Sequence, residues 1–168
     1  MQSNNTIQAD LTGKVALITG ASYGLGAYFA KLLAKNNATV VVSGRAHSKD
    51  RIDSIVKEII QNGGNAMPFI LDINEFDSFK KAIEKITAQL GHIDILINNA
   101  AVSTDKNIFD ITHEDWDKQM NANVKGLFFL SQVVAEQMKK QSNGGNIINI
   151  AAVNGEKVRK NCIVFGVL

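Results

Sequence analysis

The sequence predicts an α/β fold, a doubly wound parallel sheet with helices on both faces, and three observations support it. Short apolar runs alternate with helical patterns along the chain. The fourth run, residues 93–97, is almost wholly apolar, as expected for a strand covered on both faces. No internal repeat or low-complexity stretch interrupts this alternation. Right-handed crossovers between such units then produce the doubly wound arrangement.

Five strands and four helices are expected. The strands are residues 15–19, 39–42, 66–71, 93–97 and 146–150. The helices are residues 25–36, 52–60, 76–90 and 112–141, and the last begins with Thr112 and Asp115 in a relative of the capping box. Pro68 cannot donate a hydrogen bond to a neighbouring strand, which predicts that the third strand lies at a sheet edge.

The segment Leu127–Met138 is apolar on too many sides for an ordinary surface helix. Two interpretations stay open at this point. Either the helix is a thick core helix, or one side packs on the sheet and the other is covered by a partner subunit or by a further part of the fold.

Length and composition indicate one globular domain. The chain has 168 residues, 45% of them hydrophobic and 20% charged, with a formal net charge of +2. We expect a flexible tail over residues 1–10 and a folded domain over residues 11–168. The charge gives no general attraction to nucleic acid or membranes. No signal peptide or membrane span is expected, and the single cysteine, Cys162, fits a reducing cytoplasm. The three histidines lack the spacing of metal ligands, so no metal site is proposed.

The most informative motif is the glycine-rich segment Thr19–Gly26, which directly follows the first strand and precedes the first helix. Glycines allow a sharp turn and the close approach of an anion to the backbone. The start of the helix presents free N–H groups and a positive dipole end to a phosphate. The segment therefore predicts a pyrophosphate site, although a tight turn that binds nothing has the same local pattern.

Four motifs together resemble the short-chain dehydrogenase/reductase family, in the branch of the 3-oxoacyl acyl-carrier-protein reductases. The glycine motif matches at Thr19, Gly20, Gly24 and Gly26. The other three are Leu71-Asp72-Ile73, Asn98-Asn99-Ala100-Ala101 and Asn123-Val124-Lys125-Gly126. The resemblance covers about residues 11–155 and implies a Rossmann-type NAD(P)-binding domain, with dimers or tetramers as the expected assembly.

The resemblance also implies roles for individual residues. The expected cofactor-binding positions are Thr19, Gly20, Ser22, Tyr23, Gly24, Leu25, Gly26, Arg45, Asp72, Ile73, Asn98, Asn99 and Ala100. Asn123 is the expected catalytic asparagine. Each later motif also has a structural interpretation: Asp72 as a helix cap, Asn98 and Asn99 as an Asx turn, and Asn123 as a solvent-facing residue.

The end of the second strand favours NADP over NAD. An acidic side chain at this place would accept hydrogen bonds from the ribose hydroxyls of NAD and repel a 2′-phosphate. The chain instead has Gly44 and Arg45. A guanidinium can bind a phosphate with two parallel hydrogen bonds, and family members with arginine here prefer NADP. A solvated loop arginine is the alternative.

The chain departs from the family where its catalytic serine, tyrosine and lysine are expected. Ala152 occupies the serine position and Phe165 the tyrosine position, and the sequence ends at Leu168, one residue before the expected lysine. A methyl group cannot hydrogen-bond the reacting oxygen, and a phenyl ring has no proton to donate. The chain is therefore expected to bind the cofactor but to be catalytically impaired, as a truncated form of the family fold.

The leading hypothesis is thus a family oxidoreductase that transfers hydride between NADP and a ketone or alcohol, such as a 3-oxoacyl thioester. The alternatives are a non-enzymatic nucleotide-binding or interaction protein that pairs with an intact relative, and a truncated product without separate activity.

Overall fold

Five parallel strands form the centre of the molecule in the computed structural model, which describes residues 9–152. They lie in the order β3-β2-β1-β4-β5, and every neighbouring pair is parallel. The strands are β1 (Val15–Ile18), β2 (Thr39–Gly44), β3 (Asn65–Ile70), β4 (Ile95–Asn98) and β5 (Asn146–Asn149). The predicted fold class is confirmed, and β3 with its Pro68 is an edge strand of this sheet.

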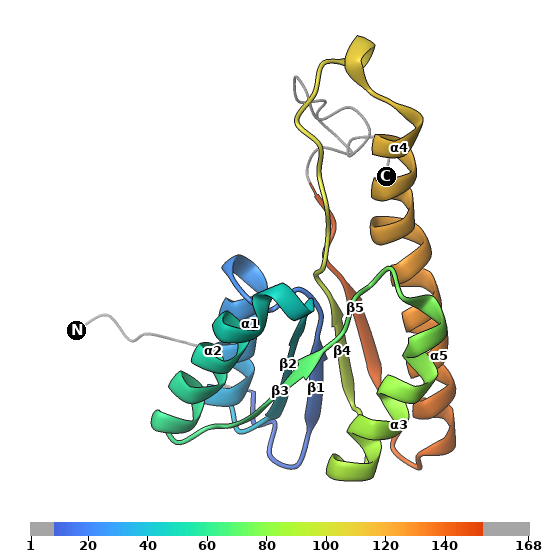
Figure 1. Ribbon diagram of the computed structural model, residues 1–168. Helices are drawn as coiled ribbons and strands as arrows, with labels where there is room; N and C mark the ends of the chain where they lie inside the picture. The colour runs from blue at the N-terminus through green and yellow to red at the C-terminus, as the bar shows by residue number, and fades with distance from the viewer. Residues whose placement is uncertain (1–8, 153–168) are drawn as a thin grey trace, which may run out of the picture.

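Helices cover both faces of the sheet (Figure 1). The longer helices are α1 (Gly24–Lys35), α2 (Lys49–Gln61), α3 (Phe79–Leu90), α4 (His113–Met120) and α5 (Leu127–Lys140). Within residues 9–152, three 3₁₀ turns join or precede them, at Ala46–Ser48, Phe76–Ser78 and Ile108–Asp110. Helices α1 and α2 pack on one face, and α3 and α5 pack on the other.

The hydrophobic core is divided into two layers by the alternation of side chains along each strand. On β1, Leu17 points to the layer of α3 and α5, whereas Ala16 and Ile18 point to the layer of α1 and α2. Both sets are fully buried. Because both faces of the central strands are covered, their sequences are apolar without a polar side, which is what made them recognisable.

Strand β4 begins two residues later than predicted, at Ile95. Asp94 lies inside the predicted range, directly before the strand, and its side chain takes part in the hydrogen bonding between β1 and this end of β4. Its carboxylate accepts a hydrogen bond of 2.8 Å from the Val15 amide, and its own amide donates to the Val15 carbonyl over 2.9 Å. A side chain therefore replaces one backbone partner at this end of the β1–β4 pair.

The single helix predicted over residues 112–141 is instead two α-helices joined by a π-helical segment, Asn121–Gly126. The predicted start is confirmed, because Thr112 and Asp115 form a complete capping box. The segment passes very close to the loop after β3: a Cβ added to Gly126 would lie 2.2 Å from the carbonyl oxygen of Ile73. Glycine at this position permits that approach.

Helix α5 buries only one side within the described residues. Leu130, Val134 and Met138 are buried against the sheet, whereas Phe128 is 59% exposed and Phe129 is 38% exposed. The thick-core interpretation therefore does not describe this helix between residues 9 and 152. The alternative interpretation, a covering partner or a further part of the fold, stays a prediction.

Within residues 9–152, none of the helices combines the length and apolar character needed to cross a lipid bilayer. Most of the expected N-terminal tail, residues 1–8, and the predicted tyrosine-position residue Phe165 lie outside the described residues.

The Asp115 carboxyl group is expected to titrate well below the ordinary range. Hydrogen bonds from the Lys106 ammonium and from the amide and hydroxyl of Thr112 lower its pKa from 3.8 to about 2. Since the pKa is lower in the folded chain, the capping box stabilises the fold above about pH 4, and this contribution is lost as the pH falls toward 2. A carboxyl ¹³C NMR titration measures the midpoint, which Lys106→Met should raise; a midpoint near 4 in the parent chain would contradict the assignment.

Candidate functional site

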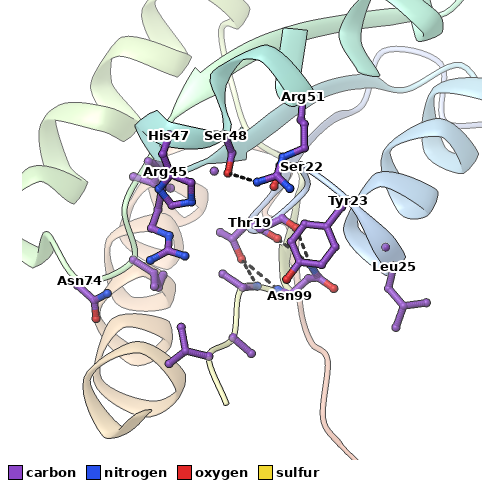
Figure 2. A pocket seen from close by; sticks show the side chains of 18 residues that line it. Thr19, Ser22, Tyr23, Leu25, Arg45, His47, Ser48, Arg51, Asn74 and Asn99 are labelled. Carbon is purple, nitrogen blue, oxygen red and sulfur yellow. Dashed lines mark hydrogen bonds between the residues drawn. The ribbon is translucent and has the colours of Figure 1, made fainter. Parts of the chain in front are cut away.

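A cavity of about 510 Å³ opens at the carboxyl ends of the strands, where β1 lies between β2 and β4. The chain order reverses at this point of the sheet: β2 and β3 lie on one side of β1, and β4 and β5 lie on the other. The loops that leave β1 and β4 therefore separate in opposite directions and leave a crevice, the usual place for a ligand in open α/β sheets. Figure 2 shows the side chains that line the cavity.

The three glycines of the segment Thr19–Gly26, at the end of β1 and the start of α1, have different physical roles. Gly20 has a φ of +62°, and a Cβ there would lie 2.8 Å from the Ala100 Cα. Gly24 has a φ of +57° with open space around it, so only its backbone conformation requires glycine. At Gly26 a Cβ would lie 2.5 Å from the Asn99 side-chain nitrogen. Gly20 and Gly26 thus allow the loop after β1, the start of α1 and the loop after β4 to lie in close contact.

A set of hydrogen bonds joins the loops after β1 and β4, centred on Thr19 and Asn99. The Thr19 hydroxyl oxygen accepts from the amides of Asn99 and Ala100, each over 3.0 Å. In return, the Asn99 side-chain amide donates to the carbonyls of Thr19 and Gly20, over 3.0 and 3.1 Å. Figure 2 shows this pair at the floor of the cavity. The two loops are thus held as one unit.

The first turn of α1 faces the cavity without a partner of its own. Tyr23, the residue before the helix, has an extended backbone and provides no side-chain cap. The first turn contains no acidic residue. Among residues 9–152, no acidic side chain therefore compensates the positive end of the helix dipole at this point, where Gly24 and Leu25 line the cavity. This arrangement fits an anion.

The remaining rim of the cavity is basic. Arg45, His47 and Arg51 come from the loop after β2 and the first turn of α2, and Figure 2 shows them along one side. Among the described residues that line the cavity there is no aspartate or glutamate. An acidic group at the end of β2, which would favour NAD, is therefore absent from this lining, and the donors suit a phosphate.

Most of the sequence-predicted cofactor residues meet at this cavity. Its lining includes Thr19, Gly20, Ser22, Tyr23, Gly24, Leu25, Arg45, Ile73, Asn99 and Ala100. Gly26 lies behind them as a packing position.

Asp72 and Asn98 do not line the cavity. Asp72 lines a neighbouring, smaller cavity, and its carboxylate accepts hydrogen bonds from the Asn74 amide and side chain, over 3.0 and 3.3 Å. Asn98 is buried and donates to the Ser131 hydroxyl and the Asn149 side chain, over 2.8 and 2.9 Å. These contacts match turn-forming and framework roles, and direct contact with a cofactor stays a prediction for both residues.

Asn123, in the π-helical segment, is not a solvent-facing residue. Its side-chain oxygen accepts from the Val102 amide and its nitrogen donates to the Val102 carbonyl, each over 2.8 Å. It therefore holds the loop after β4, of which Ala100, Ala101 and Val102 line the cavity. Ala152, beyond β5, is exposed.

Sequence reasoning missed four polar residues of the lining: His47, Ser48, Arg51 and Asn74. Arg51 had a usable signal, because it is a second basic residue in the first turn of the helix that follows Arg45. Asn74 had none, since it reaches the cavity through the course of the loop after β3. Among residues 9–152, no group of three or more potential metal ligands is close enough to hold an ion.

Comparison with known proteins assigns a family. The model of the short chain dehydrogenase family matches residues 14–166. The chain is 40% identical over 145 residues to a 3-oxoacyl acyl-carrier-protein reductase of Thermotoga maritima, a match that covers 86% of this chain and 58% of that protein. It is 36% identical over 144 residues to a 2-dehydro-3-deoxy-D-gluconate 5-dehydrogenase of Dickeya dadantii, covering 86% and 55%. The chain therefore spans somewhat over half the length of these curated relatives.

Solved structures agree with this assignment. A metagenomic short-chain oxidoreductase in complex with NADP superimposes with a TM-score of 0.87 at 28% identity, covering 95% of this chain and 71% of that one. A short-chain dehydrogenase/reductase from Serratia marcescens gives a TM-score of 0.86 at 31% identity, with coverage of 95% and 64%.

Replacing Thr19 by valine should destabilise the site, because valine has nearly the same shape but cannot accept a hydrogen bond. The amides of Asn99 and Ala100 would lose their acceptor, at a cost of about 1–3 kcal/mol for each amide left unpaired. Urea denaturation measures the change in the free energy of unfolding. Thr19→Ser, which keeps the hydroxyl, is the matched control; equal stability of the two variants would contradict the role given to the hydroxyl.

Proposed function

We propose that this chain, which belongs to the short-chain dehydrogenase family, binds NADP in the cavity at the carboxyl edge of its sheet. The observation that carries the proposal is the uncapped first turn of α1, free of acidic residues and facing a cavity without carboxylates in its described lining. Backbone amides at a helix start, close to glycines that leave room for the ligand, suit a pyrophosphate.

The basic rim supports NADP rather than NAD as the preferred dinucleotide. Arg45 is exposed at the end of β2, on the rim of the cavity. A guanidinium that hydrogen-bonds a phosphate contributes about 1.5–3 kcal/mol, which is about ten- to a hundredfold in affinity. NAD lacks the 2′-phosphate and would not gain this contribution.

The reaction class follows from the family. The bound nicotinamide supplies or accepts a hydride, and the relatives named above act on 3-oxoacyl and sugar-acid substrates according to their names. For this chain we propose a carbonyl or alcohol substrate of that kind, with Asn123 as the residue that positions the loop after β4 beside the cavity.

We further propose that this chain is catalytically impaired. Ala152 and Phe165 stand at the positions where the family resemblance implies the serine and the tyrosine. Loss of a general acid costs about two to four orders of magnitude in rate, and loss of an oxyanion donor about two or three. Such effects are not additive, but either one alone would leave slow chemistry.

Arg45→Asp should reverse the cofactor preference. The substitution removes the proposed phosphate ligand and introduces a carboxylate that repels the 2′-phosphate and can accept from ribose hydroxyls. The Kd for NADPH is expected to rise about ten- to a hundredfold, with NADH bound equally or more tightly. Fluorescence titration of the parent and the variant with both cofactors measures this. A parent chain that prefers NADH would contradict the role of Arg45.

A second test separates cofactor binding from turnover. In a sample where titration shows NADPH to be bound, addition of a 3-oxoacyl thioester or a generic ketone is expected to give no oxidation of NADPH above the background rate, measured by absorbance. Clear reduction of the ketone would show that Ala152 and Phe165 do not prevent the chemistry.

A further inference from the structure

We propose that Arg51 is the second guanidinium of the 2′-phosphate site and that Tyr23, in the glycine-rich loop, holds it in place. The inference rests on the proposed function, because it concerns how the same cavity selects NADP. It assigns specificity-determining roles to a residue outside the glycine motif and to an aromatic side chain within it.

Arg51 is held from two sides by different elements. Its Nη2 donates a hydrogen bond of 3.1 Å to the Ser48 hydroxyl, and Ser48 is itself buried. Its guanidinium carbon lies 5.7 Å from the centre of the Tyr23 ring, within the range of a cation–π contact. Figure 2 shows the guanidinium between these two partners at the edge of the cavity. A long, exposed side chain is thus oriented before any ligand binds.

The charge of Arg51 is not compensated within the described residues. The ion pairs found there involve other cations, and the nearby acid Asp53 pairs with Lys49. Positions three and four residues on either side of Arg51 on the chain carry no acidic side chain. A guanidinium with fixed orientation and no carboxylate partner, at the rim of a cavity, is suited to an anionic ligand.

Arg45 and Arg51 flank one 3₁₀ turn, Ala46–Ser48, because Arg45 directly precedes it and Arg51 lies in the first turn of α2. The Ser48 amide donates to the Arg45 carbonyl over 2.9 Å, which closes the 3₁₀ turn between the two arginines. Both residues line the same cavity. A phosphate monoester carries about −1.5 to −2 charges at neutral pH and three acceptor oxygens, more than one guanidinium satisfies. Two arginines that flank one turn and line one cavity match this charge.

Tyr23 acts through Arg51. Tyr23 is 67% exposed and its hydroxyl has no hydrogen-bond partner among the described residues, so neither burial nor a hydrogen bond accounts for an aromatic side chain here. The ring face provides the surface against which the guanidinium packs. Tyr23 is therefore a positioning residue, and its aromatic ring, not its hydroxyl, is the part that matters.

The test compares dissociation constants for NADPH and NADH, and for adenosine 2′,5′-bisphosphate and adenosine 5′-monophosphate, by calorimetric titration. Arg51→Gln should weaken NADPH and the bisphosphate about tenfold or more while changing NADH and the monophosphate less than about twofold. Lys57→Gln removes the same charge from an exposed residue of α2 outside the cavity lining, leaves the Lys49–Asp53 ion pair intact, and is the matched control for general electrostatics. It should leave the ratio of the two cofactor constants within about twofold of the parent value.

The Tyr23 variants separate positioning from direct contact. Tyr23→Leu should weaken the binding of NADPH by about two- to fivefold, because the cation–π contact is lost. The conservative Tyr23→Phe keeps the aromatic ring and should keep the selectivity of the parent chain. An Arg51→Gln variant that weakens both cofactors equally, or neither, would overturn the assignment of Arg51. Equal effects of the two Tyr23 variants would overturn the positioning role. A parent chain that binds neither cofactor would instead refute the proposed function itself, together with this inference.

Discussion

The hydrogen bonds between Thr19 and Asn99 are the constraint on which the candidate site depends. Parallel strands that separate at a reversal of the chain order leave a crevice, but a crevice alone gives two independent loops. Here one hydroxyl accepts from two amides of the opposite loop, and one side-chain amide donates to two carbonyls in return. Gly20 and Gly26 permit this connection, because a Cβ at either position would force the two loops apart.

The character of the site follows as much from what its lining omits as from what it contains. The described lining has an uncapped helix start and two arginines but no carboxylate. Elsewhere in the same chain, acidic residues perform the ordinary tasks of capping and pairing, as Asp115 does at the start of α4 and Asp94 does beside β1. An unpaired positive field is costly to the apo protein, and its concentration at one cavity indicates a site for an anionic ligand.

The sequence was sufficient for the architecture because the central strands are covered on both faces and therefore read as plain apolar runs. Pro68 identified an edge strand for a reason that is purely local, its missing N–H. The glycine motif located the cavity because its residues adjoin in sequence. Contacts between distant segments were not accessible in this way: the partner of Asn123 is Val102, twenty-one residues away, and Tyr23 meets Arg51 only after α1 and β2 have folded. Asp72 was assigned by resemblance; its carboxylate accepts a hydrogen bond from the Asn74 amide, and its contact with a cofactor stays a prediction.

The π-helical segment between α4 and α5 has a consequence for the evolution of the chain. A π turn closes i→i+5 hydrogen bonds and therefore holds one residue more than an α turn. Deleting one residue from Asn121–Gly126 would let the segment wind as a continuous α-helix, so Leu130, Val134 and Met138 would keep their side toward the sheet. The position of Asn123 would change, and with it the contact to the Val102 amide and carbonyl. The additional residue of this turn thus sets the loop geometry beside the cavity, and a single deletion here is expected to disturb that loop more than the helix.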